Sequence, residues 1–338
     1  MNDATIDRAE GALLGLAVGD ALGMPTQYLA PDVVRARYGL LDGFYPGPED
    51  NDISRGVPAG HVTDDTDQAI ILGNLLVEGG GALDPTAFAK ALLVWEEEMR
   101  ATGSLDLLGP STVKALALVS QGVSPDLTGR WGDTNGASMR IAPVGIAHLS
   151  EPLENLVDAV EDACRVTHNT GIAIAGAAAV AAAISSGLDG RPLHESIEIA
   201  IAAAEIGSRR GYYIAGPDVA ARIDWALGVV RDLEPEEALD RVIKLIGVGV
   251  ATQEAVPAAL AIASLFPTDL WAVTRHAASL GGDCDTIAAI AGAIVGAHVG
   301  ASSIPLPVRE QLAVANPDLR LRGLALSLLE LRANPAKR

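Results

Sequence analysis

Two long apolar runs, 167–188 and 286–308, constrain the fold of this chain more than any other sequence feature. Neither contains Asp, Glu, Lys or Arg, and alanine is the commonest residue in both. Runs of this length either cross a membrane or are buried in a protein core. His168 and His298 interrupt them, and neither has the aromatic belts typical of a membrane span. We therefore expect two buried central helices, the second running to about Ala301, and no membrane segment.

Helical periodicity continues through the rest of the chain. Gly292, Gly296 and Gly300 have the spacing of a small-residue contact between helices. Aromatic residues make up only 4% of the chain, which favours closely packed helices over strands. We expect an all-α fold, a single compact multi-helix domain over residues 1–338, with a surface loop at 43–60. Apolar stripes predict about a dozen helices, among them 88–99, 111–119, 153–166, 193–204, 220–230, 235–245, 255–265 and 319–331.

The charge and cysteine content limit the partners and the compartment. A formal net charge of −19, with no cluster of Lys or Arg, argues against nucleic-acid binding. The two cysteines, Cys164 and Cys284, form no C-x-x-C pair, and the acidic N-terminus lacks the pattern of a signal peptide. We expect a cytoplasmic protein that binds neither nucleic acid nor membranes.

Two acidic segments stand at predicted helix starts. Residues 63–67 read Thr-Asp-Asp-Thr-Asp, and residues 281–286 read Gly-Gly-Asp-Cys-Asp-Thr. Ordinary N-capping explains one carboxylate at each start, but not two beside a strongly apolar helix. If the two starts converge, their carboxylates need a cationic partner to stay ionised. Oxygen-only ligands favour Mg²⁺ or Mn²⁺ over Zn²⁺.

Five motifs in order resemble the ADP-ribosylglycohydrolase family, including its dinitrogenase-reductase-activating glycohydrolase branch. They are Gly-Asp-Ala-Leu-Gly at 19–23, Thr-Asp-Asp-Thr at 63–66, Asn-Gly-Ala-Ser-Met-Arg at 135–140, Thr-His at 167–168 and Gly-Gly-Asp-Cys-Asp-Thr at 281–286. Each motif is short, but their order over residues 10 to 300 is specific.

The resemblance implies a binuclear site that holds two divalent cations, Mg²⁺ or Mn²⁺. The metal ligands that it implies are Thr63, Asp64, Asp65, Asp283, Asp285 and Thr286. A carboxylate among Asp20, Asp64 and Asp65 would handle the proton. The substrate-binding residues that it implies are Asn135, Gly136, Ser138, Met139 and His168, and the 109–112 segment resembles a further cleft loop.

The implied reaction is hydrolysis at the anomeric carbon of the ribose, in an ADP-ribosylated protein or a small ADP-ribosyl compound. The chain departs from the family pattern at Asp67-Gln68, at Asn169-Thr170 and at Cys284. These departures leave two alternatives open. One is an N-ribosyl hydrolase, similar to a nucleosidase, that acts on a smaller ribosyl compound. The other is a catalytically silent relative that binds ADP-ribose or has a structural role.

Overall fold

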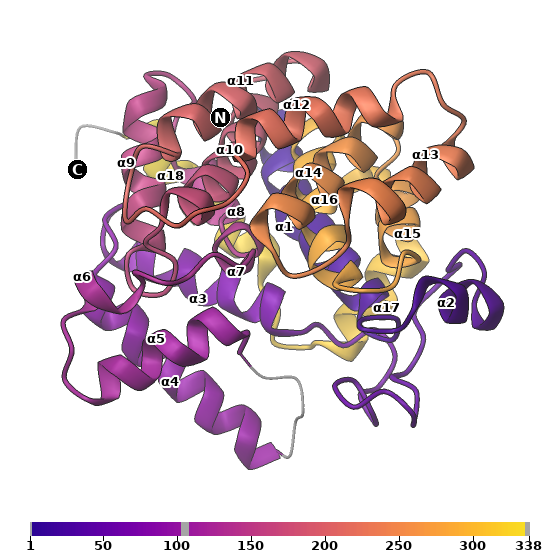
Figure 1. Ribbon diagram of the computed structural model, residues 1–338, viewed down its shortest axis with the longest axis horizontal. Helices are drawn as coiled ribbons and strands as arrows, with labels where there is room; N and C mark the ends of the chain where they lie inside the picture. The colour runs from indigo at the N-terminus through magenta and orange to yellow at the C-terminus, as the bar shows by residue number, and fades with distance from the viewer. Residues whose placement is uncertain (1, 103–107, 335–338) are drawn as a thin grey trace.

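Two glycine-rich helices, α1 (Asp3–Gly23) and α16 (Cys284–Val299), pack side by side at the centre of the computed structural model (Figure 1). A Cβ atom added to Gly15 would lie 2.2 Å from the backbone oxygen of Gly292, so the two backbones approach as closely as only glycine allows. Gly11 meets Gly296 and Gly23 meets Asp285, so the helices run antiparallel. The C-terminal end of α1 therefore lies beside the N-terminal end of α16.

The structure describes residues 2–102 and 108–334, and these contain no β-strand. The all-α expectation is confirmed. The expected domain, 1–338, also includes residues 1, 103–107 and 335–338, which lie outside the described residues. The remaining α-helices are α2 (Pro31–Arg37), α3 (Asp64–Glu78), α4 (Pro85–Thr102), α5 (Pro110–Ser120), α6 (Pro125–Thr128), α7 (Gly136–Met139), α8 (Ala142–Ala147), α9 (Leu153–Cys164), α10 (Gly171–Leu188), α11 (Leu193–Gly207), α12 (Val219–Val230), α13 (Pro235–Arg241), α14 (Thr252–Leu265), α15 (Leu270–Ala278), α17 (Leu306–Ala315) and α18 (Leu321–Ala333).

The first apolar run forms α10, which is buried along its whole length. By length and composition α10 is apolar enough to span a membrane, but 100% of it lies inside the protein. It packs against α8, α9, α11 and α16, and it begins at Thr170, whose side chain accepts from the Ala173 amide. The expectation of a buried central helix here is confirmed.

The second apolar run begins with α16, the buried central helix that was expected to run to about Ala301 and that stops two residues short of it. α16 ends at Val299, because Gly300 adopts a left-handed φ of 87°. A 3₁₀ turn at Ala301–Ser303 follows, and Pro305 then precedes α17. The chain leaves the core at this point, so only the part up to Val299 serves as a central helix.

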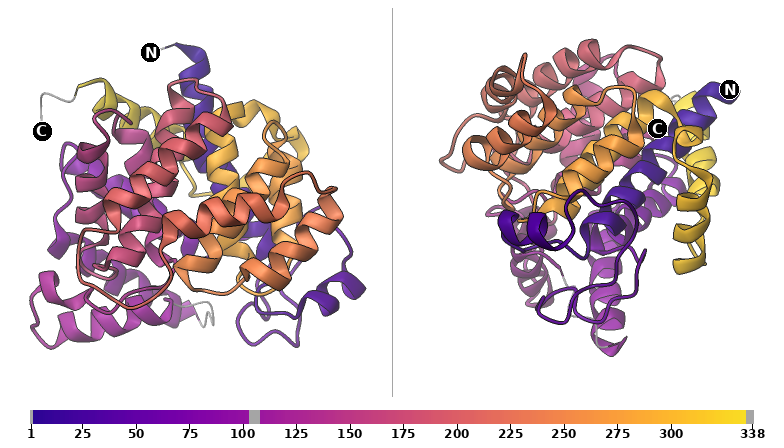
Figure 2. Two further views of the ribbon diagram at one scale, coloured as in Figure 1. Left: turned by 45° about the horizontal axis from the view of Figure 1, so that its top comes forward. Right: turned by 90° about the vertical axis from the view of Figure 1, so that its right-hand side faces the viewer.

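The outer helices enclose the central pair on several sides (Figures 1 and 2). α3 contacts α1, α16 and α18, which places the first turn of α3 near the end of α1. No helix occurs between Arg37 and Asp64, in agreement with the loop expected at 43–60. The helix expected at 235–245 is α13 followed by a π-helical turn, Val242–Ile246.

Candidate active site

The first turn of α3 is attached to α1 through the carboxylate of Asp20. Thr63 is the N-cap of α3, and its backbone amide donates to both carboxylate oxygens of Asp20 at 3.1 and 3.0 Å. The amide of Thr66 donates to Asp20 Oδ2 at 3.2 Å, and its hydroxyl also donates to that oxygen. A buried carboxylate thus satisfies the free amides of a helix start. This contact fixes where Asp64 and Asp65 lie.

A turn of two glycines sets the start of α16. Gly281 and Gly282 have φ values of 73° and 64°, a left-handed conformation that glycine adopts without strain. The amide of Asp283 then donates to the Val248 carbonyl at 2.7 Å. The side-chain amide of Asn135 donates to Asp283 Oδ2. Asp283 is therefore held from both its backbone and its side chain.

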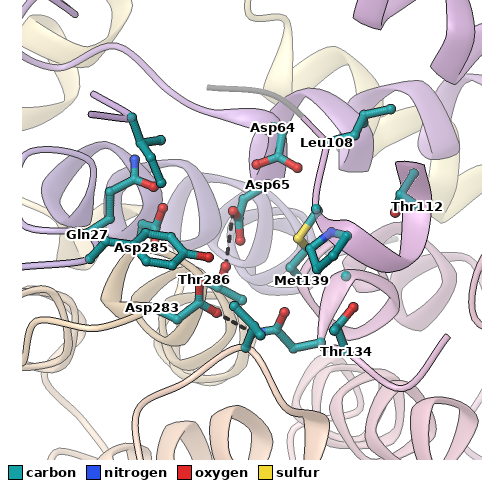
Figure 3. Close-up of a pocket in the computed structure, with 17 residues that line it drawn as sticks. Gln27, Asp64, Asp65, Leu108, Thr112, Thr134, Met139, Asp283, Asp285 and Thr286 are labelled. Atoms are coloured by element: carbon teal, nitrogen blue, oxygen red, sulfur yellow. Dashed lines mark hydrogen bonds between the residues drawn. The ribbon is translucent and has the colours of Figure 1, made fainter. Parts of the chain in front are cut away.

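The two acidic helix starts meet at one pocket, which Figure 3 shows in close-up. The hydroxyl of Thr286 donates to Asp65 Oδ2 at 3.3 Å and joins α16 to α3. The pocket has a volume of about 270 Å³. The residues expected from the sequence that line it are Asp64, Asp65, Asn135, Gly136, Met139, Asp283, Asp285 and Thr286.

Burial raises the pKa of every carboxyl group in this pocket. The pKa of Asp64 rises to about 8 because of its burial and the nearby charges of Asp20 and Asp283. The pKa of Asp283 rises to about 6, chiefly because of burial. The pKa values of Asp65 and Asp285 rise well above the usual range, because both are buried among other carboxylates. Such a cluster takes up either protons or cations.

The donor set of the pocket fits a hard divalent cation. Asp65 Oδ1 and Asp285 Oδ1 are buried and have no hydrogen-bond partner among the described residues. No Lys or Arg is among the described residues that line the pocket. In the described ranges, no three His, Cys, Asp or Glu side chains are grouped so that they could hold a metal ion as they stand. The fit therefore depends on the unpaired carboxylate oxygens, which Mg²⁺ or Mn²⁺ would satisfy.

Four residues expected at the site, Asp20, Thr63, Ser138 and His168, do not line this pocket. Asp20 lies behind the first turn of α3, bonded to it as described above, and Thr63 lines a neighbouring cavity. Ser138 and His168 are buried beneath the pocket wall. The amides of Ser138 and of its neighbour Met139 donate to the Asn135 carbonyl, so they are already used within the turn.

A chain of hydrogen bonds supports the pocket from below. The fully buried Arg140 donates to Gln68 Oε1 at 2.6 Å, and Gln68 donates to Asp64 Oδ2 at 2.7 Å. Arg140 also donates to the hydroxyl of Thr167, which contacts His168 Nδ1 at 2.8 Å. Burial lowers the pKa of His168 well below its usual value, so the ring is neutral. Gln68, a departure from the family pattern, thus contacts a predicted metal ligand.

Several residues that line the pocket belong to no motif from which the sequence could have predicted them. Gln27, Tyr28, Ile53 and Val250 all lie between helices and reach the pocket only through the tertiary fold. Tyr28 has a positive φ of 57°, and its amide donates to the Gly282 carbonyl at 2.6 Å. The 109–112 segment does reach the pocket, because Gly109, Pro110 and Thr112 are among the lining residues.

Comparison with known proteins gives consistent matches over the whole chain. A sequence model of the ADP-ribosylglycohydrolase family matches residues 1–337. The protein YegU of Escherichia coli K12 is 33% identical over 327 residues, which is 96% of this chain and 97% of YegU. The ADP-ribosylarginine hydrolase Tri1 of Pseudomonas putida is 28% identical, over 90% of this chain and 73% of Tri1. A solved structure described as an ADP-ribosylglycohydrolase-related protein complex superimposes with a TM-score of 0.66 at 27% identity, covering 98% of this chain and 99% of the other.

Proposed function

This chain belongs to the ADP-ribosylglycohydrolase family, and from that premise we propose that it hydrolyses the bond at the anomeric carbon of ribose in an ADP-ribosylated substrate, using two Mg²⁺ or Mn²⁺ ions. One observation carries the proposal: two acidic helix starts, far apart in sequence, share one pocket in which Asp65 Oδ1 and Asp285 Oδ1 lack partners. The name of the relative Tri1, an ADP-ribosylarginine hydrolase, supports the class of substrate.

The chain offers six oxygen ligands for the two ions. They are Asp64, Asp65, Asp283, Asp285 and Thr286, which line the pocket, and Thr63, which lies outside it with its hydroxyl 3.4 Å from Asp65 Oδ2. When bound, two such ions hold the 2- and 3-hydroxyls of a ribose and lower the pKa of a water molecule. They also let a chain of net charge −19 accept an anionic substrate.

The carboxylates divide into two roles. Asp20 accepts from two amides and one hydroxyl of the α3 start and lies outside the pocket, so we assign it to positioning. Asp64 and Asp65 line the pocket, and we assign proton acceptance from the attacking water to one of these two. Their negative charge also stabilises the positive charge that develops on the ribose in an oxocarbenium-like transition state.

The wall opposite the carboxylates is shaped for close approach of a sugar. A Cβ atom at Gly136 would lie 2.9 Å from the His168 ring, so a larger residue does not fit there without a shift of that ring. The side-chain amide of Asn135 donates to Asp283, and both Asn135 and Gly136 line the pocket. The glycine at 136 is thus required by the His168 ring beneath the wall, and we assign Gly136 to ribose contact because it lines the pocket.

The pocket volume bears on the size of the substrate. A pocket of about 270 Å³ is near the lower end of the ~300–1,000 Å³ typical of ligand sites. It suits the ribosyl group, while the rest of an ADP-ribosyl substrate would lie at its mouth. The same volume suits a simple nucleoside, so the nucleosidase-like alternative belongs in the test.

Cys164 and Cys284 are buried and form no disulfide, which supports the proposal that the protein works in a reducing cytoplasm.

A substrate panel tests the proposal. ADP-ribosyl-arginine, an ADP-ribosyl-serine peptide and simple nucleosides are incubated with the protein, with and without Mg²⁺ or Mn²⁺. Release of ADP-ribose only with metal is the expected result, and release of ribose or a base from nucleosides alone favours the second candidate. If nothing is cleaved while calorimetry detects metal binding, the catalytically silent alternative replaces the proposal.

A further inference from the structure

A second cavity lies at the other end of the central helix pair. Its volume is about 550 Å³, and it is formed by the N-terminal part of α1, the C-terminal end of α16, the start of α11 and the α14–α15 connection. Arg8 on α1 and His298 on α16 line it. Arg8 precedes Asp20 by twelve residues of helix, about 18 Å at ~1.5 Å per residue. The cavity is therefore separate from the acidic pocket.

This cavity is basic although the protein as a whole is strongly acidic. Its charged and titratable lining residues are Arg8, Arg191, His194 and His298, and no Asp or Glu is among the described residues that line it. Among the acidic residues adjacent in sequence to the lining, Asp189 accepts from Arg332 and Ser150, and Glu195 lies 3.9 Å from Arg191. Asp7 accepts from Ser302, and Asp269 accepts from the Ala272 amide at the start of α15. The lining of this cavity thus carries basic groups and no carboxylate, although the protein has a net charge of −19.

Arg8 is the unpaired cation of this cavity. It forms no ion pair or hydrogen bond with any described residue, although Gly190 lies next to its guanidinium. Arg191, by contrast, pairs with Glu151 at 2.7 Å and lies 3.9 Å from Glu195. A half-buried arginine without an acidic partner, facing a cavity, is best explained by an anionic ligand.

Hydrogen-bond donors surround the same space. The Thr268 hydroxyl comes from the α14–α15 side, where the Ser264 hydroxyl already donates to the Ala261 carbonyl at 2.6 Å. Pro192 precedes α11, a helix of fifteen residues for which the described residues supply no side-chain cap. His298 is satisfied by the Ile294 carbonyl and the Ser196 hydroxyl, so it forms the floor and leaves the anion to the other groups. The Arg8 guanidinium, the Thr268 hydroxyl and the amides at the start of α11 together form the donor set of a phosphate site.

We propose that this cavity binds a phosphate group, with Arg8 as its main ion-pairing residue and the start of α11 as its second contact. The proposal does not depend on the proposed hydrolase activity, because the two sites share no lining residue. The ligand is either free phosphate or the phosphate of a nucleotide, which present the same group to Arg8.

Titration calorimetry with inorganic phosphate and with AMP tests the proposal, on full-length protein in EDTA so that no metal is bound. We expect the wild type to bind one phosphate, and Arg8→Gln to weaken binding at least ~10-fold, the loss of one charge-assisted contact. His194→Gln, at an exposed position of the same cavity, is a second variant and should weaken binding less. Binding of AMP tighter than phosphate identifies a nucleotide, and binding of phosphate alone identifies the free anion.

Two control variants establish whether phosphate binding is specific to this cavity. Arg241→Gln removes an exposed arginine that pairs with Glu237 on α13, away from the cavity, and should change the affinity less than ~2-fold. Asp285→Asn alters the acidic pocket and should also leave phosphate binding unchanged. The proposal is overturned if the wild type binds no phosphate, or if folded Arg8→Gln and His194→Gln both bind it as the wild type does.

Discussion

The hydroxyl of Thr286 donates a hydrogen bond to Asp65 Oδ2 at 3.3 Å, although the two residues are 221 positions apart in the sequence. The contact orients the Asp65 carboxylate and leaves its Oδ1 without a donor. Asp285, the neighbour of Thr286, also has a buried Oδ1 without a partner. The start of each of the two helices, α3 and α16, therefore contributes one unsatisfied anionic oxygen to the same pocket. Unsatisfied buried carboxylates destabilise a fold unless a ligand compensates them, and this gives the site measurable properties beyond catalysis.

Asp285→Asn is expected to stabilise the metal-free protein and abolish metal-dependent hydrolysis. The amide keeps the shape of the side chain but removes a carboxyl group that, on folding, must either take up a proton or be buried as a charge close to Asp283. We expect the Tm of the metal-free variant to rise by a few °C, at ~2–4 °C for each kcal/mol in a chain of this size. We also expect kcat/KM to fall by about 100-fold or more in the presence of metal.

Differential scanning fluorimetry with and without Mn²⁺ checks this prediction. The wild type should gain stability on addition of Mn²⁺, and Asp285→Asn should gain little, because one ligand is lost. Glu237→Gln, at an exposed ion pair on α13, serves as a charge-matched control and should respond to Mn²⁺ as the wild type does. A lower Tm for metal-free Asp285→Asn would contradict the electrostatic argument.

The stability of the metal-free protein should fall as the pH rises. The pKa of Asp64 is raised from about 3.8 to about 8, and that of Asp283 to about 6, so the folded state holds protons that the unfolded state has released. The stabilising effect of these protons is complete below about pH 4 and is lost as the pH rises through 6 and 8. Urea unfolding in EDTA between pH 5 and pH 8.5 measures this slope.

Divalent cations should reduce that slope, since they compete with protons for the same oxygens. Added Mn²⁺ is thus expected to stabilise the protein more at pH 8 than at pH 5.5. In Asp64→Asn the slope between pH 6 and 8 should be smaller even without metal. An identical slope in wild type and variant would show that other groups carry the pH dependence.

Gly292→Ala is expected to be strongly destabilising, because α1 and α16 touch through their backbones. A Cβ at this position would lie 2.2 Å from the Gly15 carbonyl oxygen, and neither helix can move without disturbing the core. We expect a loss of about 3 kcal/mol or more, at the upper end of overpacking effects. Gly228→Ala is the matched control, because nothing lies within 4 Å of its added Cβ. That variant should gain about 0.5–1 kcal/mol from helix propensity.

The individual helices and their acidic starts could be predicted from the sequence, whereas the contacts that bring them together could not. The acidic starts at 63–67 and 281–286 are visible because capping residues and carboxylates are adjacent in the chain. The spacing of Gly292 and Gly296 indicated a helix contact, but nothing local indicates that the partner is α1. That pairing depends on the register of two helices separated by most of the chain.

The helices that the sequence did not predict are those too short to show a helical period. α2, α6, α7 and α8 have at most seven residues, too few for a 3.6-residue pattern to show. Residues such as Tyr28 and Val250 reach the pocket from connecting segments. The second apolar helix was expected to run to about Ala301, and it ends two residues earlier, at Val299, because the backbone turns at Gly300.

Asp20 and Asp64 should respond in opposite ways to removal of their carboxylates, which distinguishes positioning from ligation. Asp20 accepts from the amides of Thr63 and Thr66 and from the Thr66 hydroxyl, so Asp20→Ala leaves three buried donors at the start of α3 unpaired. We expect the metal-free variant to lose about 2–4 kcal/mol. Asp64 accepts only from Gln68, and its charge lies close to those of Asp20 and Asp283, so Asp64→Ala should lose little stability or gain some.

Urea unfolding in EDTA and Mn²⁺ titration of both variants give the comparison. Both should bind Mn²⁺ more weakly, Asp64→Ala because a ligand is missing and Asp20→Ala because Thr63 and the first turn of α3 are no longer held. Only Asp20→Ala should lose global stability as well. If Asp20→Ala unfolds at the wild-type urea concentration, the hydrogen bonds from α3 do not offset the burial of that carboxylate, and Asp20 belongs among the groups that the cations stabilise directly.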